Sequence, residues 1–469
     1  MSKRIFLTAM VLFTVFLKSC SFAPEYLRPE MPVADSFPAA TKPGDGRQQA
    51  LDAADIGWRD YFVDSALQQL IAAALANNRD LRQSALAVES YQAQYRIQRS
   101  ALLPTVSGGG SGTKQRAYSY GGNHVTSEYY SLSAGVTAYE LDFFGRVKNL
   151  KENALEQYLA MEEAHRSVRL SLVAEVARAY LTLLADREML AITEDTLRNE
   201  EESYQLVEQR AKEGVSTQLA LAQARIGLET ARVDLALYRR QVGLDLNSLS
   251  LLTGAEMPVL PEASAISDRQ PFPSLSGQIS SRVLLQRPDI LAAEHELKGA
   301  NANIGAARAA FFPSVSLTAN AGVMSGGLSD LFDGSSGTWL FSPSITLPIF
   351  TAGRLDAQLD VAKIRKEISV ANYEKAIQTA FREVADALVA LDTYREQLSA
   401  QKANLQANQD YYATARDRYQ EGLDSSLTLL DAQRSLFDAR RAYVSLRLAQ
   451  QVNQVNLYKV LGGGWKELG

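Results

Sequence analysis

Side chains that could do chemistry are few in this chain and stand apart from one another. Cys20 is the only cysteine, so an intrachain disulfide and a thiolate metal cluster are both excluded. The three histidines, His124, His165 and His295, do not pair at the spacings typical of metal ligands. We therefore predict a protein that is not an enzyme, with no catalytic residue, no metal and no cofactor.

Nucleotide and nucleic-acid binding also find little support. The glycine-rich run from Gly108 to Lys114 superficially matches a phosphate-binding loop. However, neither Ser nor Thr follows Lys114, and the run leads toward a hydroxyl-rich strand instead of a helix. Small residues lining a β-strand explain it better. The net charge of −5 without a basic stripe disfavours a nucleic-acid partner.

The N-terminus predicts export from the cytoplasm. Residues 1–19 match a secretory signal, since two basic residues precede an apolar run over 5–17 that is too short for a permanent membrane span. Cys20 then resembles the acylated first residue of mature bacterial lipoproteins, although Lys18 departs from the usual small or apolar residue. The alternative is an ordinary signal peptide with an unmodified cysteine. Ser21 is not the aspartate that typically retains lipoproteins in the inner membrane, which favours the outer membrane.

The chain repeats itself. Residues 145–254 match residues 353–462 at an offset of 208, and upstream of Pro104 the offset is 209. Glycines occupy matched positions in the two copies: Gly145 and Gly353, Gly214 and Gly422, and Gly254 and Gly462. Two copies of one long unit predict a single elongated body built twice.

Alternating apolar and small polar residues predict two β-strands in each copy. The expected strands cover residues 106–113, 131–138, 315–323 and 339–347, with polar loops over 116–128 and 326–337. Strands of about ten residues cross a bilayer when tilted, and their hydroxyl and glycine alternates suit a water-filled lumen. A soluble β-sandwich could show the same alternation, so the strands alone leave both architectures open.

Helical stretches flank the strands, and two of them are unusually long. Shorter helices are expected over 62–101 and 279–310. From Arg354 to about Tyr419 there is neither proline nor glycine, which predicts a helix of roughly 100 Å. A heptad seam runs along it through Ile377, Val384, Leu391, Leu398, Leu405, Tyr412 and Tyr419. Gly214 and Gly422 predict left-handed stops, each followed by a returning helix.

Four strands cannot close a sheet by themselves. An open sheet in a membrane would expose unsatisfied N–H and C=O groups to hydrocarbon, at a cost of several kcal/mol per group. The sheet must therefore close with copies from other subunits, and the long helices would then close into a tube.

Five long, ordered stretches carry a resemblance to a known family. They are residues 57–62 (GWRDYF), 139–146 (YELDFFGR), 287–290 (RPDI), 302–314 (ANIGAARAAFFPS) and 429–435 (LLDAQRS). With them the whole chain resembles the TolC/OprM family of outer-membrane efflux channels, and closely its OprM-like lipoprotein branch. The resemblance implies a homotrimer, a twelve-stranded barrel, and a periplasmic helical tunnel that narrows at the hairpin tips.

The resemblance also implies roles for particular residues at the tips. Asp431 would face the pore, where three copies would form a ring that binds cations and favours opening when protonated. An ordinary solvated helix charge is the alternative. Some relatives carry a second aspartate where this chain has Thr428. Tyr419 and Tyr412 would brace the closed tip, although their place on the heptad seam is better explained by core packing.

The resemblance also implies which residues contact the adaptor and which would hold the tip closed. The periplasmic adaptor would contact the two tip turns at Gly214, Val215, Gly422 and Leu423. Ala220 and Asp424 stand where some relatives carry polar contacts that lock the tip, so no such contact is evident.

We predict a TolC-like fold, a membrane β-barrel with a long α-helical barrel and an internal twofold repeat. The expected segments are a signal peptide (1–19), a lipidated linker (20–60), a first repeat (61–254), a linker (255–280) and a second repeat (281–464). The predicted function is the outer-membrane exit duct of a tripartite multidrug efflux pump, with a periplasmic adaptor, an inner-membrane drug/proton antiporter and outer-membrane lipid as partners. The alternatives are the outer component of a type I protein secretion system and a coiled-coil scaffold lipoprotein without a pore.

Overall fold

The computed structural model of the protein describes residues 21–38, 56–118, 121–255, 265–269, 272–273 and 280–463. The chain folds into two compact units. The first unit comprises the N-terminal segment up to Glu30, residues 87–162 and residues 292–374, and the second comprises residues 31–86, 163–291 and 375 onward. The two longest helices, α5 (Arg146–Lys212) and α8 (Arg354–Gln420), contribute to both units.

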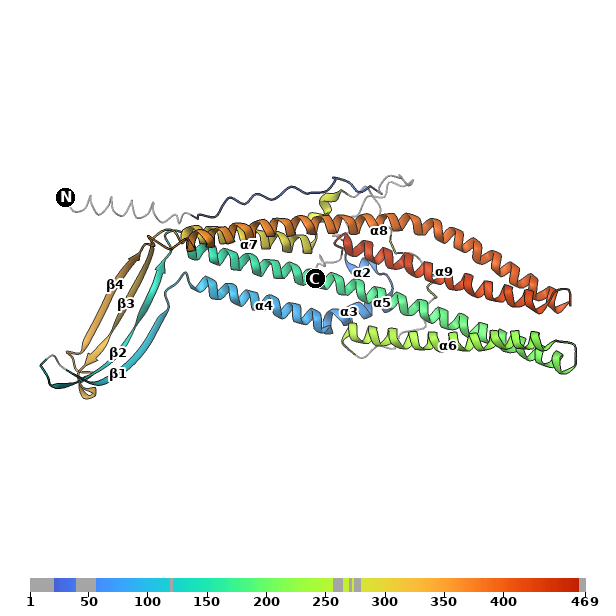
Figure 1. The fold of residues 1–469 in the computed structure, drawn as a ribbon, viewed down its shortest axis with the longest axis horizontal. Coiled ribbons are helices and arrows are strands. Elements are labelled where there is room, and N and C mark those ends of the chain that lie inside the picture. The colour runs from blue at the N-terminus through green and yellow to red at the C-terminus, as the bar shows by residue number, and fades with distance from the viewer. Residues whose placement is uncertain are drawn as a thin grey trace. The chain divides into compact units, whose positions relative to one another are not determined.

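A four-stranded antiparallel sheet dominates the first unit (Figure 1). Its strands are β1 (Val106–Tyr118), β2 (His124–Leu141), β3 (Ser314–Ser325) and β4 (Gly337–Thr346), in the order β1-β2-β3-β4. Four strands, two per copy, confirm the prediction. The expected loop over 116–128 is wrong, because β1 and β2 pair as far as Tyr118 and His124. An ion pair between Lys114 of β1 and Glu128 of β2 joins the two strands at the edge of that stretch.

The sheet has two open edges, and much of its apolar surface is uncovered. β1 and β4 each pair with one neighbour only, so their outer N–H and C=O groups can pair with further strands. Every residue of β4 is exposed, including Trp339, Phe341 and Ile345. Apolar side chains on an exposed strand are typical of a surface that lipid or a neighbouring sheet will cover.

The shorter helices of the two copies are interrupted where the sequence predicted continuous stretches. The stretch 62–101 divides into α3 (Ser65–Asn77) and α4 (Arg79–Ser100), preceded by the short helix α2 (Trp58–Tyr61). Asp64 caps α3 through Leu67 N–H, and the Asn78 side chain accepts from Leu81 N–H at the break. The stretch 279–310 divides into η2 (Ser281–Gln286) and α7 (Pro288–Ala309), and a further turn η3 (Leu328–Asp330) lies between β3 and β4.

An aromatic cluster forms the core of the second unit. Trp58, Tyr61 and Phe62 are almost fully buried. The ring of Tyr61 stacks on Tyr458 at 4.2 Å between centroids, and the Tyr458 hydroxyl donates to the carbonyl of Ile56 at 2.8 Å. The stretch 57–62 therefore serves to pack the core of this unit.

The buried Arg287, in the second copy of the repeat, makes hydrogen bonds and ion pairs within the same unit. Its guanidinium donates to the carbonyl of Val460 at 2.8 Å and to the carboxylates of Asp289 at 2.7 Å and Glu383 at 2.9 Å. The two carboxylates compensate the buried positive charge of Arg287. The bond to Val460 holds the start of α7 to the end of α9 (Ser426–Val460).

The repeat is visible in the backbone itself. Helices α5 and α8 each have 67 residues, and each is followed by a returning helix, α6 (Gln218–Thr253) or α9 (Figure 1). The three glycine pairs predicted from the sequence all have positive φ: Gly145 and Gly353, Gly214 and Gly422, Gly254 and Gly462. Only glycine adopts this conformation without strain.

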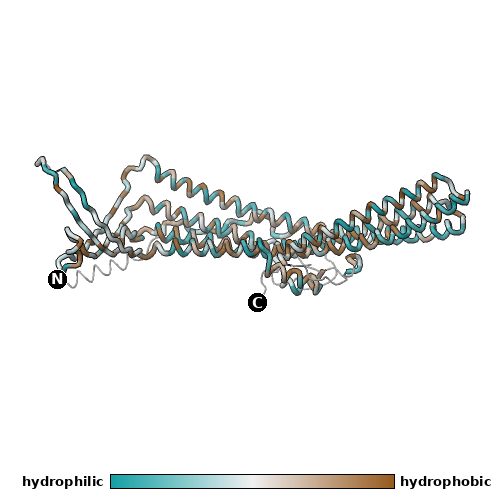
Figure 2. The backbone as a smooth tube through the Cα atoms, turned by 90° about the horizontal axis from the view of Figure 1, so that it is seen from below, coloured by the Kyte–Doolittle hydropathy of each residue, from teal (hydrophilic) through white to brown (hydrophobic). Residues whose placement is uncertain are grey.

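The helices of the second unit carry apolar and polar residues side by side along their length (Figure 2). The predicted heptad seam of α8 is fully buried at Ile377 and Val384 and half-buried farther along, at Leu398 and Leu405. Val176 and Leu183 of α5, which lie 208 residues before Val384 and Leu391, are fully buried as well. Among the helices of the described residues, none combines the length and the apolar content needed to cross a membrane.

Candidate functional site: the helical tips and the N-terminal segment

The two tip turns have the same backbone. In the first tip, Gly214 N–H donates to the Ala211 carbonyl at 3.1 Å and Val215 N–H to the Arg210 carbonyl at 2.8 Å. In the second tip the equivalent bonds, 208 residues later, are 3.1 Å and 2.9 Å long. Gly214 and Gly422 have φ of 75° and 74°. A Cβ added to either glycine would meet no atom within 4 Å, so the left-handed conformation alone requires glycine here.

Both tips present apolar side chains to solvent. Val215 and Leu423 are 75% and 66% exposed. A second equivalent pair, Leu219 and Leu427 at the second position of each returning helix, is 69% and 60% exposed. Leu219 and Leu427 were not among the contact residues predicted from the sequence, although their spacing of 208 residues matches the repeat and could have indicated them. Each tip thus presents one matched pair of exposed apolar side chains, which is suited to contact with a protein partner.

Polar contacts at the tips correct the expectation that none is evident. The Arg418 guanidinium donates to both carboxylate oxygens of Asp424, at 2.7 and 3.0 Å, within the second tip. Arg210 of the first tip instead donates to the hydroxyl of Tyr419 at 3.2 Å, with its guanidinium 5.3 Å from the centre of that ring. Tyr419 is buried. This bond between α5 and α8 joins the two hairpins of one chain.

The predicted constriction residues fall into two groups. Asp431 and Thr428 lie one turn apart on α9, and Tyr412 and Tyr419 lie on α8. The Asp431 side chain is half exposed and accepts from Arg434 at 2.7 Å, an i,i+3 neighbour that the sequence prediction overlooked. Thr428 lies 3.4 Å from the hydroxyl of Ser425. Tyr412 is half-buried, and burial raises its pKa. Whether Asp431 lines a pore stays a prediction.

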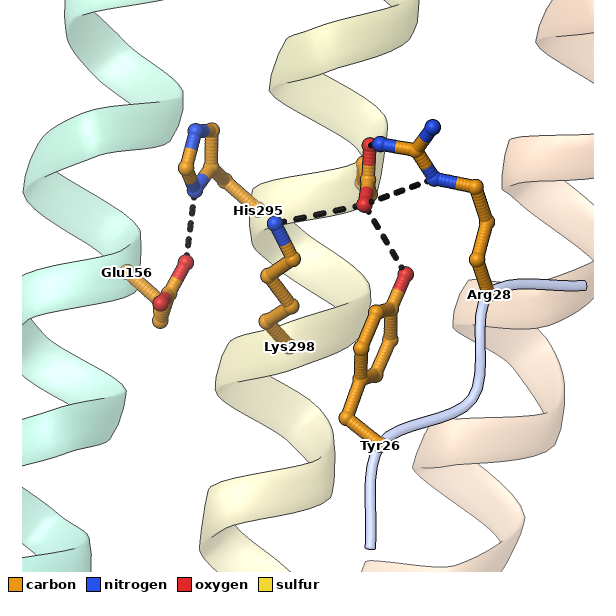
Figure 3. Close-up of polar contacts among 6 residues, drawn as sticks. Tyr26, Arg28, Glu156, His295 and Lys298 are labelled. Carbon is orange, nitrogen blue, oxygen red and sulfur yellow. Dashed lines mark hydrogen bonds and ion pairs between the residues drawn. The ribbon is translucent and has the colours of Figure 1, made fainter.

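The N-terminal segment is held to α7 in the first unit. Cys20, the predicted acylation site, lies outside the described residues. Eight residues after it, Arg28 donates to the buried Glu294 at 2.6 Å, and Tyr26 and Lys298 contact the same carboxylate, both at 3.2 Å (Figure 3). Burial alone would raise the pKa of Glu294, but the Arg28 hydrogen bond and Lys298 hold that pKa below its ordinary value.

Contacts continue to the first described residues of this segment. Asn301 donates to the carbonyl of Pro24 at 2.7 Å, and Arg308 donates to the carbonyl of Phe22 at 3.1 Å. The Phe22 ring stacks on Phe312 at 4.5 Å. On the neighbouring face of α7, His295 contacts Glu156 of α5 at 2.6 Å (Figure 3). The segment from Phe22 to Arg28 is therefore fixed to α7 at several points.

A metal centre is not formed by the residues that the structure describes, since no three His, Cys, Asp or Glu side chains gather there in a metal-binding arrangement.

Comparisons with known proteins identify the chain's relatives. The family model described as outer membrane efflux protein matches residues 70–255 and 279–463. These two matches begin 209 residues apart and end 208 apart, as the internal repeat requires. The chain belongs to the outer membrane efflux protein family.

Individual relatives match over nearly their whole length. The antibiotic efflux pump outer membrane protein ArpC of Pseudomonas putida is 50% identical and is matched over 100% of this chain and 97% of its own length. The cation efflux system protein CusC of Escherichia coli is 46% identical over 96% and 97%. The open-state crystal structure of the Neisseria gonorrhoeae MtrE outer membrane channel is 39% identical, with a TM-score of 0.87 over 95% of this chain and 99% of that one.

These relatives confirm the fold class and the location. The fold is that of the TolC-like channels, in which four strands per chain contribute to a trimeric barrel continued by helices. The protein is an outer-membrane exit duct of an efflux pump.

Proposed function

We propose that the protein works as a homotrimer and as a passive duct, gated at its periplasmic helical tips and free of any catalysed reaction. The open edges of β1 and β4 support this most directly. Three sheets joined edge to edge satisfy those edges and make twelve strands, which a single chain cannot achieve. Free energy for export then comes from an inner-membrane transporter, proposed as a drug/proton antiporter.

A periplasmic adaptor is the proposed partner of the tips. Val215, Leu219, Leu423 and Leu427 are solvent-exposed at matched positions of both tips, and large exposed apolar residues in a small area are unusual unless a partner covers them. Two copies of this patch per chain would give six in a trimer, so an adaptor could bind either tip with the same contacts.

The proposed cargo is a range of small organic compounds, including antibiotics. ArpC is named for antibiotics and CusC for cations, yet each shares nearly half or more of its residues with this chain. Because similar ducts serve such different cargo, we infer that the transporter selects the substrate. The secretion and scaffold alternatives gain no support from relatives that are named efflux proteins.

Two measurements test this function. Purified protein should run as a heat-resistant trimer in detergent and conduct ions in planar bilayers. A soluble, non-conducting protein would instead indicate a coiled-coil scaffold without a pore. Deleting the gene should increase susceptibility to several unrelated antibiotics. Loss of one exported protein, with unchanged susceptibility, would instead indicate type I secretion.

Docking is tested by placing charge on the tip patch. Val215→Asp and Leu423→Asp should each reduce antibiotic export while trimers remain in the outer membrane. Gly422→Val should do the same, because a β-branched residue at positive φ costs about 1–2 kcal/mol and distorts the turn. Trimers that disappear in these variants would show that the tips serve folding instead of docking.

A further inference from the structure

A cleft near the tips of the second unit contains a buried carboxylate without a partner. The cleft has a volume of about 390 Å³ and lies between α5, α6 and α9. Glu200 of α5 lines it and is only 7% exposed, and its Oε2 has no hydrogen-bond partner within the described part of the chain. An unpaired buried carboxylate is costly, so its presence needs an explanation.

The surroundings of Glu200 give it no compensating donor. Three threonines line the cleft, but Thr193, Thr196 and Thr230 each donate to a carbonyl of their own helix. Gln433 of α9 also lines the cleft, is 7% exposed, and has an Nε2 without a partner among the described residues. Two buried polar groups with opposite hydrogen-bonding needs therefore face one cavity.

A glycine inside α6 makes room for this carboxylate. A Cβ added to Gly227 would lie 2.5 Å from Glu200 Oε2. Glycine is a weak helix former, so its position in the middle of a helix agrees with a local requirement for space. The arrangement brings the Glu200 carboxylate directly against the backbone of α6.

The charge and the walls of the cleft indicate the class of ligand. Its charged lining residues are three carboxylates, Glu200, Asp234 and Asp431, and one guanidinium, Arg434, which already pairs with Asp431. The cleft is therefore negative overall. Its remaining walls include Ile226, Leu427, Leu430 and Phe437. A few convergent polar groups within apolar walls, in a volume of about 300–1,000 Å³, are typical of small-molecule sites.

We propose that this cleft binds a small organic monocation, an amine with an apolar body whose ammonium group donates to Glu200. A π-system or an oxygen elsewhere on the same molecule would accept from Gln433. The proposal does not depend on whether the duct conducts or which pump it serves, because it concerns a cleft formed within one chain.

The test uses the full-length protein purified as its oligomer, with 4-phenylbutylamine as the probe and 4-phenylbutanol as its neutral counterpart. Calorimetric titration at pH 8, corrected for titration into detergent alone, should show saturable binding of the amine and much weaker binding of the alcohol. Glu200→Gln should lower the affinity for the amine about tenfold or more, since a charge-assisted hydrogen bond is lost.

Two further variants separate the site from a general charge effect. Glu201→Gln removes the same charge one residue away, from a side chain 43% exposed and 3.7 Å from Arg232, and should leave the affinity within about twofold. Gly227→Ala keeps every charge but displaces the Glu200 carboxylate, and should weaken binding. Equal losses in Glu200→Gln and Glu201→Gln, or unchanged affinity in Gly227→Ala, would overturn the proposal.

The pH dependence provides an independent readout. Burial raises the pKa of Glu200 to about 7. The neighbouring charged or titratable groups are Asp234 on α6, Tyr412 on α8, and Asp431 and Arg434 on α9. The amine stays protonated below pH 8, so affinity should fall about tenfold from pH 8 to pH 6 as Glu200 gains its proton. Affinity that is constant over this range, or absence of saturable binding because water or a neighbouring copy fills the cleft, would refute the site.

Discussion

The two helical tips share one backbone and differ in how their arginines are paired. Arg210 and Arg418 occupy equivalent positions, and both carbonyls accept from the same two residues of the following turn. The second tip places Asp424 where the first has Ser216. Asp424 binds Arg418 within its own turn, whereas Arg210, facing a serine, contacts Tyr419 of the other hairpin.

This difference shows how a duplicated chain acquires unequal halves. The backbone of the tip is fixed by glycine and by carbonyl positions, which both copies retain. The presence of Asp424 lets Arg418 bind within its own turn, whereas Arg210, without an equivalent carboxylate, binds Tyr419 of the other hairpin. The first tip therefore supplies the link that we expect to hold the two hairpins together.

The largest effect is expected from breaking this link. Tyr419→Phe removes the hydroxyl that accepts from Arg210 and keeps the buried ring. A hydrogen bond to a charged group contributes about 1.5–3 kcal/mol, so the equilibrium should shift about tenfold or more toward an open tip. Single-trimer conductance in planar bilayers measures this shift. Tyr411→Phe, at a tyrosine 41% exposed on the same helix, is the control and should leave conductance unchanged.

The charged pair on α9 should give the next largest effect. Asp431 and Arg434 stand where the first copy has Gln223 and Ile226, so this pair is a second point at which the copies differ. Asp431→Gln should weaken block by multivalent cations about fivefold, and Arg434→Gln should strengthen it by a similar factor, because the carboxylate is then unopposed. If both variants change block in the same direction, Asp431 does not act as a cation site.

The sequence predicted features that depend on local pattern, and it failed where a contact depends on three-dimensional pairing. Strand number, helix length and the left-handed glycines follow from periodicity and backbone sterics. The loop expected over 116–128 was wrong because charged residues such as Lys114 and Glu128 hide the alternation while pairing across strands. Arg210 and Tyr419 are 209 residues apart, and no local pattern relates them.

The same limit applied to the candidate site. Glu200 is one of many helical glutamates in the sequence, and only packing against Gly227 distinguishes it as buried. Arg434, in contrast, could have been noticed, because an i,i+3 spacing from Asp431 predicts an ion pair on a helix.

Copying the second tip into the first should have a moderate effect. Ser216→Asp places a carboxylate beside Arg210 with the backbone geometry that lets Asp424 bind Arg418. The carboxylate should then compete with Tyr419 for Arg210 and shift the tip about threefold toward opening, since exposed ion pairs contribute about 0.2–1 kcal/mol. Adding Arg210→Ala to this variant should produce no further opening beyond that of Arg210→Ala alone. Additive effects of the two changes would show that the serine position acts independently of Arg210.

The reverse exchange should have the smallest effect. Asp424→Ser makes the second tip resemble the first, but Tyr419 is already bound by Arg210, so conductance should stay close to that of the unmodified trimer. The Arg418 hydrogen bond lowers the pKa of Asp424, so the stabilisation from this pair is present above the ordinary pKa of an aspartate and is lost only as the pH falls through the lowered value. Wild type and Asp424→Ser should therefore differ by the same small amount from pH 5 to pH 8 in hydrogen exchange of residues 421–425. An Asp424→Ser trimer that opens as far as Tyr419→Phe would place the lock in the second turn, and the unequal roles of the two tips would have to be reversed.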